Sequence, residues 1–199
     1  MARAAPLTPA ERRTTLLVAA RAVFADRGYH RASVADIIEA AGVARGTFYN
    51  HFESKRDVFA AVLGALMLDV VASVAPIDVT GDVAAQVHAN LRAITRAFAA
   101  EGDAVRILFT DAQSVDADGE QALAAFYAHA LARVERALST GQALGIVRPG
   151  ETRQAARCLL GLLKEPVMQA RLAHEPLDAD AVAGAIFGLL THGLLVDPT

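Results

Sequence analysis

Residues 33–55 read SVADIIEAAGVARGTFYNHFESK, and the fold expected for the N-terminal part of the chain follows from this stretch. Ser33 followed three residues later by Asp36 is a typical helix start, because both side chains can accept from free backbone N–H groups. Apolar residues then recur at helical spacing up to Gly42, which can turn the chain at positive φ without strain. In the short segment that follows, Phe48 is the inward apolar residue and the other side chains are mainly polar. Two short helices joined by a glycine turn predict a helix-turn-helix.

This stretch, together with the residues just before it, resembles the DNA-binding region of the TetR family of bacterial repressors. The positions that agree in residue type and spacing are Phe24, Gly28, Tyr29, Ser33, Val34, Ile37, Ala41, Gly42, Val43, Gly46, Thr47, Phe48, Tyr49, His51, Phe52 and Lys55. Two positions depart from the family pattern: Ala44 stands where a helix-capping Ser or Thr is common, and Ile38 stands where Ala is usual. By motif, the resemblance covers about residues 10–60.

The composition is that of a folded protein without a membrane partner. The chain has 199 residues, of which 54% are hydrophobic, so we expect a sizeable packed core. It has no apolar run of membrane-spanning length and no signal-peptide pattern, which predicts a cytoplasmic protein. The single cysteine, Cys158, excludes an internal disulfide, and we expect its thiol to be buried and inert. No Cys and His cluster has zinc spacing, so no metal or other cofactor is expected.

The charge is distributed unevenly along the chain. The overall net charge is −3, which by itself argues against a polyanionic partner. Residues 1–59 nevertheless hold nine Lys and Arg against six Asp and Glu, a net charge of +3, and the remainder carries −6. A basic N-terminal third that contains the helix-turn-helix indicates that this end faces double-stranded DNA.

Capping residues and helix breakers indicate where several helices begin and end. Thr8 followed by Glu11 predicts the start of a first helix, and Gly28 predicts its end. Ser54 with Asp57 predicts the start of a fourth helix, by the same capping logic. Pro166 predicts a kink or an interruption in a late apolar helix.

No segment alternates apolar and polar residues as a strand would. We therefore expect an all-α protein of about nine helices, an arrangement that TetR-like proteins share. Residues 1–53 form the predicted helix-turn-helix DNA-binding domain, a three-helix bundle. Residues 54–199 form a larger helical domain for effector binding and dimerisation, and its first helix connects it to the bundle.

The candidate DNA contacts lie on the second helix of the motif and at its flanks. Thr47 offers a methyl group to a thymine and a hydroxyl group to a phosphate, while Arg45 can reach a guanine edge or a phosphate. The phenol of Tyr49 can bond a phosphate, whereas Phe48 and Phe52 are expected in the core. The full candidate set, to which the resemblance assigns the same contacts, is Ser33, Arg45, Gly46, Thr47, Tyr49, His51 and Lys55.

One short reading helix binds weakly, so a two-fold dimer on a near-palindromic site is expected. The last two helices are apolar on more than one face, and the resemblance implies a four-helix dimer interface made from these segments. The predicted interface residues are Leu159, Leu163, Ile186, Leu189 and Leu190. A fully intramolecular core is the alternative for the same residues.

The middle helices combine aromatic walls with a few polar groups, as small-molecule pockets do. The candidate pocket residues are Met67, His88, Phe98, Phe109, Phe126 and Tyr127. Plain packing is the alternative for each of them.

These patterns favour a ligand-responsive transcriptional repressor that a small apolar or amphipathic effector releases from its operator. The alternative is a DNA-binding regulator without such an effector, controlled by a protein partner or by its abundance. An enzyme is not expected, because the sequence has no phosphate-binding GxxxxGK and no HExxH motif, although His88, His129 and Asp111 can in principle converge.

Overall fold

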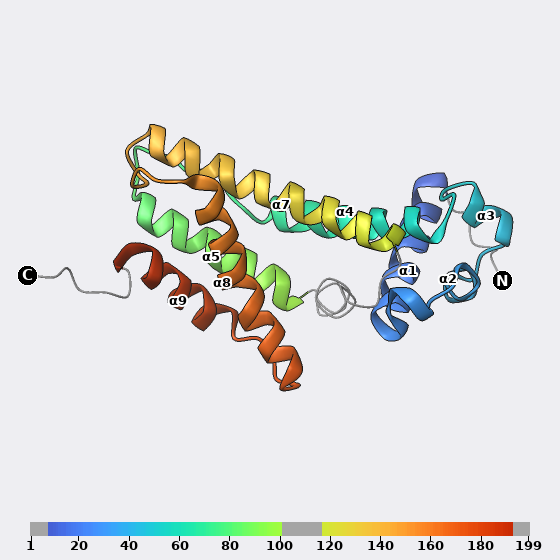
Figure 1. The fold of residues 1–199 in the computed structure, drawn as a ribbon. Helices are drawn as coiled ribbons and strands as arrows, with labels where there is room; N and C mark the ends of the chain where they lie inside the picture. The colour runs from blue at the N-terminus through green and yellow to red at the C-terminus, as the bar shows by residue number, and fades with distance from the viewer. Residues whose placement is uncertain (1–7, 101–116, 193–199) are drawn as a thin grey trace, which may run out of the picture. The chain divides into compact units, whose positions relative to one another are not determined.

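The computed structural model describes residues 8–100 and 117–192, and the elements within these ranges are helices (Figure 1). Their bounds are α1 Pro9–Arg31, α2 Val34–Ala41, α3 Arg45–Tyr49, α4 Lys55–Ala72, α5 Val83–Ala100, α7 Ala117–Ala143, α8 Thr152–Leu172 and α9 Ala179–His192. No strand occurs in these two ranges, so the prediction of an all-α protein is confirmed.

Among the described residues, no helix is both long enough and apolar enough to cross a membrane.

The chain packs as two compact units. The first comprises the described residues of Met1–Leu66 and Asp103–Phe126, and the second those of Met67–Gly102 and Tyr127–Thr199. The division falls inside α4 and inside α7. The functional boundary between residues 53 and 54 stays a prediction, while the packing boundary after Leu66 lies within α4.

The first unit is built on α1 and an aromatic cluster. Thr8 and Glu11 form the predicted capping box, because the Thr8 hydroxyl accepts from the Glu11 N–H and the Glu11 carboxylate accepts from the Thr8 N–H. Phe24, Tyr29 and Phe59 bury their rings against one another, with centroids 4.5 to 5.7 Å apart. Such pairs add about 0.5–1.5 kcal/mol each beyond their area burial, so they fix the α1–α4 pairing.

Gly28 interrupts α1 close to the predicted end. Its backbone has φ 75° and ψ 161°, which is not helical. A positive φ of this size favours glycine, which has no Cβ atom. The chain makes one further turn before Ala32, whose N–H donates to the Gly28 carbonyl oxygen at 3.2 Å. The carbonyl groups that follow Gly28 therefore do not continue the regular hydrogen-bond ladder of the helix.

The second unit is organised around the pairing of α5 with α9. The Thr95 hydroxyl is fully buried and donates to the Ala179 carbonyl oxygen at 2.9 Å. Asp180 accepts from Arg92 at 2.9 Å and from Arg96 at 2.8 Å. Hydrogen bonds from these two guanidinium groups, Arg96 first, lower the pKa of Asp180.

Two expectations bear on α8. The helix runs from Thr152 to Leu172 with Pro166 inside it, so the proline does not interrupt the helix, and the alternative of a kink stays a prediction. Cys158 is exposed rather than buried. The helix buries Ala156 and Val167 instead, which places Cys158 off the buried face.

Candidate nucleic-acid interface

The start of α2 is fixed by a reciprocal capping box. The Ser33 hydroxyl accepts from the Asp36 N–H at 3.2 Å, and the Asp36 carboxylate accepts from the Ser33 N–H at 2.8 Å and from the Ser33 hydroxyl at 2.7 Å. Arg27 adds a 2.6 Å ion pair to the same carboxylate. The Ser33 bonds first, then Arg27, lower the pKa of Asp36. Ser33 is exposed, but its hydroxyl group already donates its proton to Asp36. The groups that suit an anion here are therefore the backbone N–H groups in the first turn of α2.

A buried anchor determines which face α3 presents. Gly42 has φ 63°, as the predicted turn requires, and Val43 donates back to the Ile38 carbonyl oxygen at 3.3 Å. Phe48 is 0% exposed and its ring lies 5.8 Å from that of Phe52, so both predicted core residues are in the core.

The opposite side of α3 carries the predicted reading residues. The Arg45 guanidinium lies 5.7 Å from the centre of the Tyr49 ring, and Tyr49 is 46% exposed. Thr47 is half-buried, and helical spacing turns it away from these two residues. A Cβ atom placed on Gly46 meets nothing within 4 Å, so any need for glycine there comes from a bound partner rather than from this chain.

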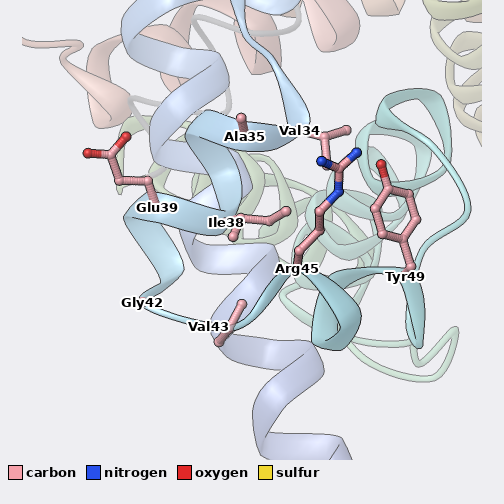
Figure 2. Close-up of a pocket in the computed structure, with 8 residues that line it drawn as sticks. All are labelled: Val34, Ala35, Ile38, Glu39, Gly42, Val43, Arg45 and Tyr49. Carbon is pink, nitrogen blue, oxygen red and sulfur yellow. The ribbon is translucent and has the colours of Figure 1, made fainter.

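An open hollow of about 350 Å³ runs between α2 and α3, and Figure 2 shows Arg45 and Tyr49 standing side by side along it. Its walls are mostly apolar. The lining residues are Val34, Ala35, Ile38, Glu39, Gly42, Val43, Arg45 and Tyr49. A surface with an apolar wall, a cation and a phenol suits the edge of a DNA major groove, which offers thymine methyl groups, base acceptors and nearby phosphates.

Three residues follow α3 at the edge of this surface. His51 is half-buried, and Lys55 points its ammonium group back to the carbonyl oxygens of Tyr29 and Ala32, at 2.9 and 3.2 Å. Asn50 is exposed directly after Tyr49, and its amide can contact bases or phosphates. Asn50 is not in the predicted set of DNA contacts, although its position directly after Tyr49 in the polar second helix of the motif indicated such a contact.

None of the predicted ligand residues lines the hollow between α2 and α3. His88 stacks on Phe187 with ring centroids 4.7 Å apart, and Phe98 is buried on α5. Met67 and Phe126 are half-buried on α4 and α7. Tyr127 is half-buried, and its burial raises its pKa.

Two further predicted residues, Phe109 and Asp111, lie outside the described residues. The second hollow, about 250 Å³ at the connection between α7 and α8, is lined by residues of that connection, from Leu138 to Ala155.

The predicted interface residues divide into two groups. Ile186 is 4% exposed within the single chain, so it belongs to the intramolecular core of the second unit. Leu190 is 45% exposed, and Leu159, Leu163 and Leu189 are half-buried. These four remain available, at least in part, to a partner surface.

Comparison with known proteins identifies the N-terminal region. Residues 16–62 match the model of the bacterial regulatory proteins of the tetR family. The transcriptional activator FasR of Mycolicibacterium smegmatis is 51% identical over 53 residues, which are 27% of this chain and 24% of FasR. The transcriptional repressor KstR2 of the same organism is 44% identical over 63 residues, 32% of this chain and 31% of KstR2. The chain thus spans about a quarter to a third of the length of these curated relatives.

Solved structures are similar over nearly the whole chain. A TetR-family transcriptional regulator structure from Syntrophomonas wolfei superposes with a TM-score of 0.83 at 23% identity, covering 96% of this chain and 100% of that one. FadR from Bacillus subtilis, solved in complex with stearoyl-CoA, gives 0.79 at 20% identity, covering 92% and 99%. Residues 16–62 thus carry the sequence pattern of the tetR family of bacterial regulatory proteins, and nearly the whole chain shares the fold of solved TetR-family structures.

Proposed function

We propose that this protein is a transcriptional repressor that binds a near-palindromic operator as a homodimer in the cytoplasm and leaves it when a small ligand binds. The observation that supports this best is the presentation of α3. Buried Phe48 and Phe52 hold a helix that exposes Arg45 and Tyr49 on one face and leaves Thr47 half-buried. The hollow beside that face continues the same surface onto α2.

Each contact has a chemical role in this proposal. Thr47 packs its methyl group on a thymine, and Arg45 donates to a guanine edge or a phosphate. Tyr49 donates its phenolic proton to a phosphate oxygen, and Gly46 lets the DNA backbone approach closely. His51 donates to a phosphate at the edge, and Ser33 places the free N–H groups of α2 toward another.

We propose that the protein represses transcription rather than activating it. KstR2 and BepR, which match the N-terminal region at 44% identity, are named repressors, whereas FasR is a named activator. A reporter gene placed behind the operator tests the sign: repression predicts that deleting the gene for this protein raises expression.

Dimerisation through α8 and α9 supplies the second reading helix. The half-exposed Leu190 and the open space beside Gly184 and Gly188 allow a second pair of helices to approach closely. Two half-sites multiply the phosphate and base contacts, which a single five-residue α3 cannot provide alone.

We propose an amphipathic ligand with a fatty-acyl chain as the effector class. The support is the fold shared with FadR of Bacillus subtilis, whose structure contains stearoyl-CoA. The coupling between the ligand site and the DNA site is expected to be about 1–3 kcal/mol, as is usual for two linked sites.

A gel-shift titration tests both steps. The operator is first selected from random DNA with the purified dimer, and stearoyl-CoA and free stearate are then titrated into the complex. The proposal predicts a specific protein–operator complex that dissociates when either ligand is added. Absence of any selected sequence would refute the DNA-binding function, whereas a complex insensitive to acyl ligands would refute only the effector class.

The second candidate, a regulator without a small-molecule effector, is favoured by the packing of two predicted pocket residues. His88 is occupied by its stack on Phe187, and Phe98 is buried in the second unit. Thermal-shift measurements against acyl-CoAs, fatty acids and other apolar metabolites separate the candidates, because a ligand that binds the folded state raises the melting temperature.

A further inference from the structure

The side chain of Lys55 turns back from the first residue of α4 onto the connection between α1 and α2. Its ammonium group donates to the carbonyl oxygens of Tyr29 at 2.9 Å, Ala32 at 3.2 Å and His30 at 3.4 Å. The same nitrogen lies 4.2 Å from the centroid of the Tyr29 ring. An ammonium group has three N–H donors, so these three carbonyl oxygens account for all of them. We call this set of contacts the Lys55 clamp.

The clamp occupies a position that favours a cation within the chain. The α1 backbone leaves helical geometry at Gly28, so the carbonyl groups that follow lack a regular helical ladder. The C-terminal end of a helix also carries partial negative charge. Tyr29 is 1% exposed, and a cation over a ring in partly dehydrated surroundings is held more strongly than one at an open surface.

The clamp also joins the two ends of the helix-turn-helix. Ala32 lies just before α2 and Lys55 lies at the start of α4, so the residues between them are the whole helix-turn-helix. Ser54 caps α4 by accepting from the Asp57 N–H at 3.1 Å, which sets the direction in which Lys55 leaves the helix.

We propose that Lys55 is a positioning residue that fastens α4 to the start of the helix-turn-helix, and that it is not a phosphate contact. This proposal rests on the proposed DNA-binding function. Contact with a phosphate would require the ammonium group to leave three carbonyl acceptors and an aromatic face. Arg45, which is exposed and rests on Tyr49, carries the positive charge toward DNA instead.

Substitution by arginine separates the two roles of Lys55. Arginine binds a phosphate at least as well as lysine, but its planar fork cannot direct three N–H groups at three carbonyl oxygens that converge on one point. In the full-length dimer, we expect Lys55→Arg to weaken operator binding about tenfold, whereas a phosphate contact would keep it within about twofold of wild type. Fluorescence anisotropy on the selected operator measures this, and near wild-type affinity overturns the proposal.

The dependence on salt gives an independent measurement. For Lys55→Gln, the slope of log K against log salt should equal the wild-type slope, because no phosphate contact is lost. Loss of one contact in each copy would make the slope shallower by roughly 1.8, since each neutralised phosphate contributes about 0.9, and that result overturns the proposal. Arg45→Gln is the matched control, and its slope should become shallower.

The specificity of DNA binding distinguishes a positioning role of Lys55 from a purely stabilising one. Circular dichroism first identifies a temperature at which both Lys55 variants and wild type are folded. At that temperature a positioning role predicts a lower ratio of operator affinity to random-DNA affinity, because the reading helices are misplaced. An unchanged ratio in the folded variants would overturn the proposal. A wild-type dimer without operator binding refutes the proposed function itself.

Discussion

Arg45 and Tyr49 restrain each other on the exposed face of α3. The guanidinium group lies 5.7 Å from the centre of the phenol ring, and both side chains line the hollow between α2 and α3. A side chain held in place before binding loses less conformational entropy when it meets a phosphate. The two residues therefore act as one preorganised element, and removing the ring would also free the guanidinium group.

Replacing Tyr49 by Phe removes the hydroxyl group and keeps the ring under Arg45. We expect the affinity for operator and for random DNA to fall alike, by about 1 kcal/mol for each copy, because one hydrogen bond to a phosphate is lost. Anisotropy titrations with both DNAs measure the change.

Thr47→Ala is the comparison variant, and it should weaken the operator complex more than the random one because its methyl group is expected on a base. Neither variant should change the mass of the proposed dimer. Full affinity in Tyr49→Phe would mean that the phenol does not contact DNA.

The capping carboxylate of α2 makes stability depend on pH. Hydrogen bonds from Ser33, and then Arg27, lower the pKa of Asp36 below its ordinary value of 3.8. The folded pKa is below the unfolded one, so the stabilisation is present above the unfolded pKa and is lost as the pH falls through the folded pKa. Denaturant melts should show Asp36→Asn less stable than wild type at neutral pH, with the gap closing below pH 3.8. Glu39→Gln removes a carboxylate of the same helix outside the capping box and is the control for the loss of charge alone.

At the scale of elements, α3 is a five-residue helix without a capped start. Ala44 has the extended backbone of an N-cap residue, with φ −70° and ψ 149°, but no side-chain hydrogen bond. A helix this short is not stable alone, so its order comes from Phe48. The resemblance had already identified Ala44 as a departure, and the structure confirms that the cap is missing.

Ala44→Ser should supply the missing cap. The serine oxygen can accept from a first-turn N–H, and we expect the free energy of unfolding to rise by about 1 kcal/mol. Thermal and urea melts measure it. Ala60→Ser, at an exposed position inside α4, is the matched control and should not stabilise the protein. Equal effects of the two substitutions would show that the gain is not a cap.

At the scale of the whole molecule, assembly is expected to control DNA binding. Leu190 is an exposed apolar side chain on α9, and placing a charge there should split the proposed dimer. We expect Leu190→Glu to sediment as a monomer and to lose most of its operator affinity, because the two half-sites are no longer linked. Leu68→Glu, at an exposed position on α4, is the control and should stay dimeric. A dimeric Leu190→Glu variant would place the interface elsewhere.

The sequence predicted contacts that are local and could not predict those that depend on distant partners. Ser33 with Asp36, Gly42 and Phe48 are set by neighbours within one or two turns, and capping rules and apolar spacing were enough. The Lys55 clamp joins residues 23 to 26 positions apart through the geometry at Gly28, for which no local pattern exists.

The same reasoning applies to the larger unit. Apolar spacing predicts that a helix has an inward face, but not which helix covers that face. The sequence therefore left open whether Ile186 meets a partner or the chain's own core, where it is buried, and whether His88 meets a ligand or another side chain such as Phe187, on which it stacks.

The exposed thiol of Cys158 makes α8 accessible to chemical labelling. Because the sequence contains one cysteine, a maleimide dye reacts at a single defined place in each chain without any engineered residue. Mixing chains labelled with donor and acceptor dyes would then report subunit exchange as energy transfer. The wild-type protein thus provides its own probe for following assembly in real time, with DNA and ligands added in turn.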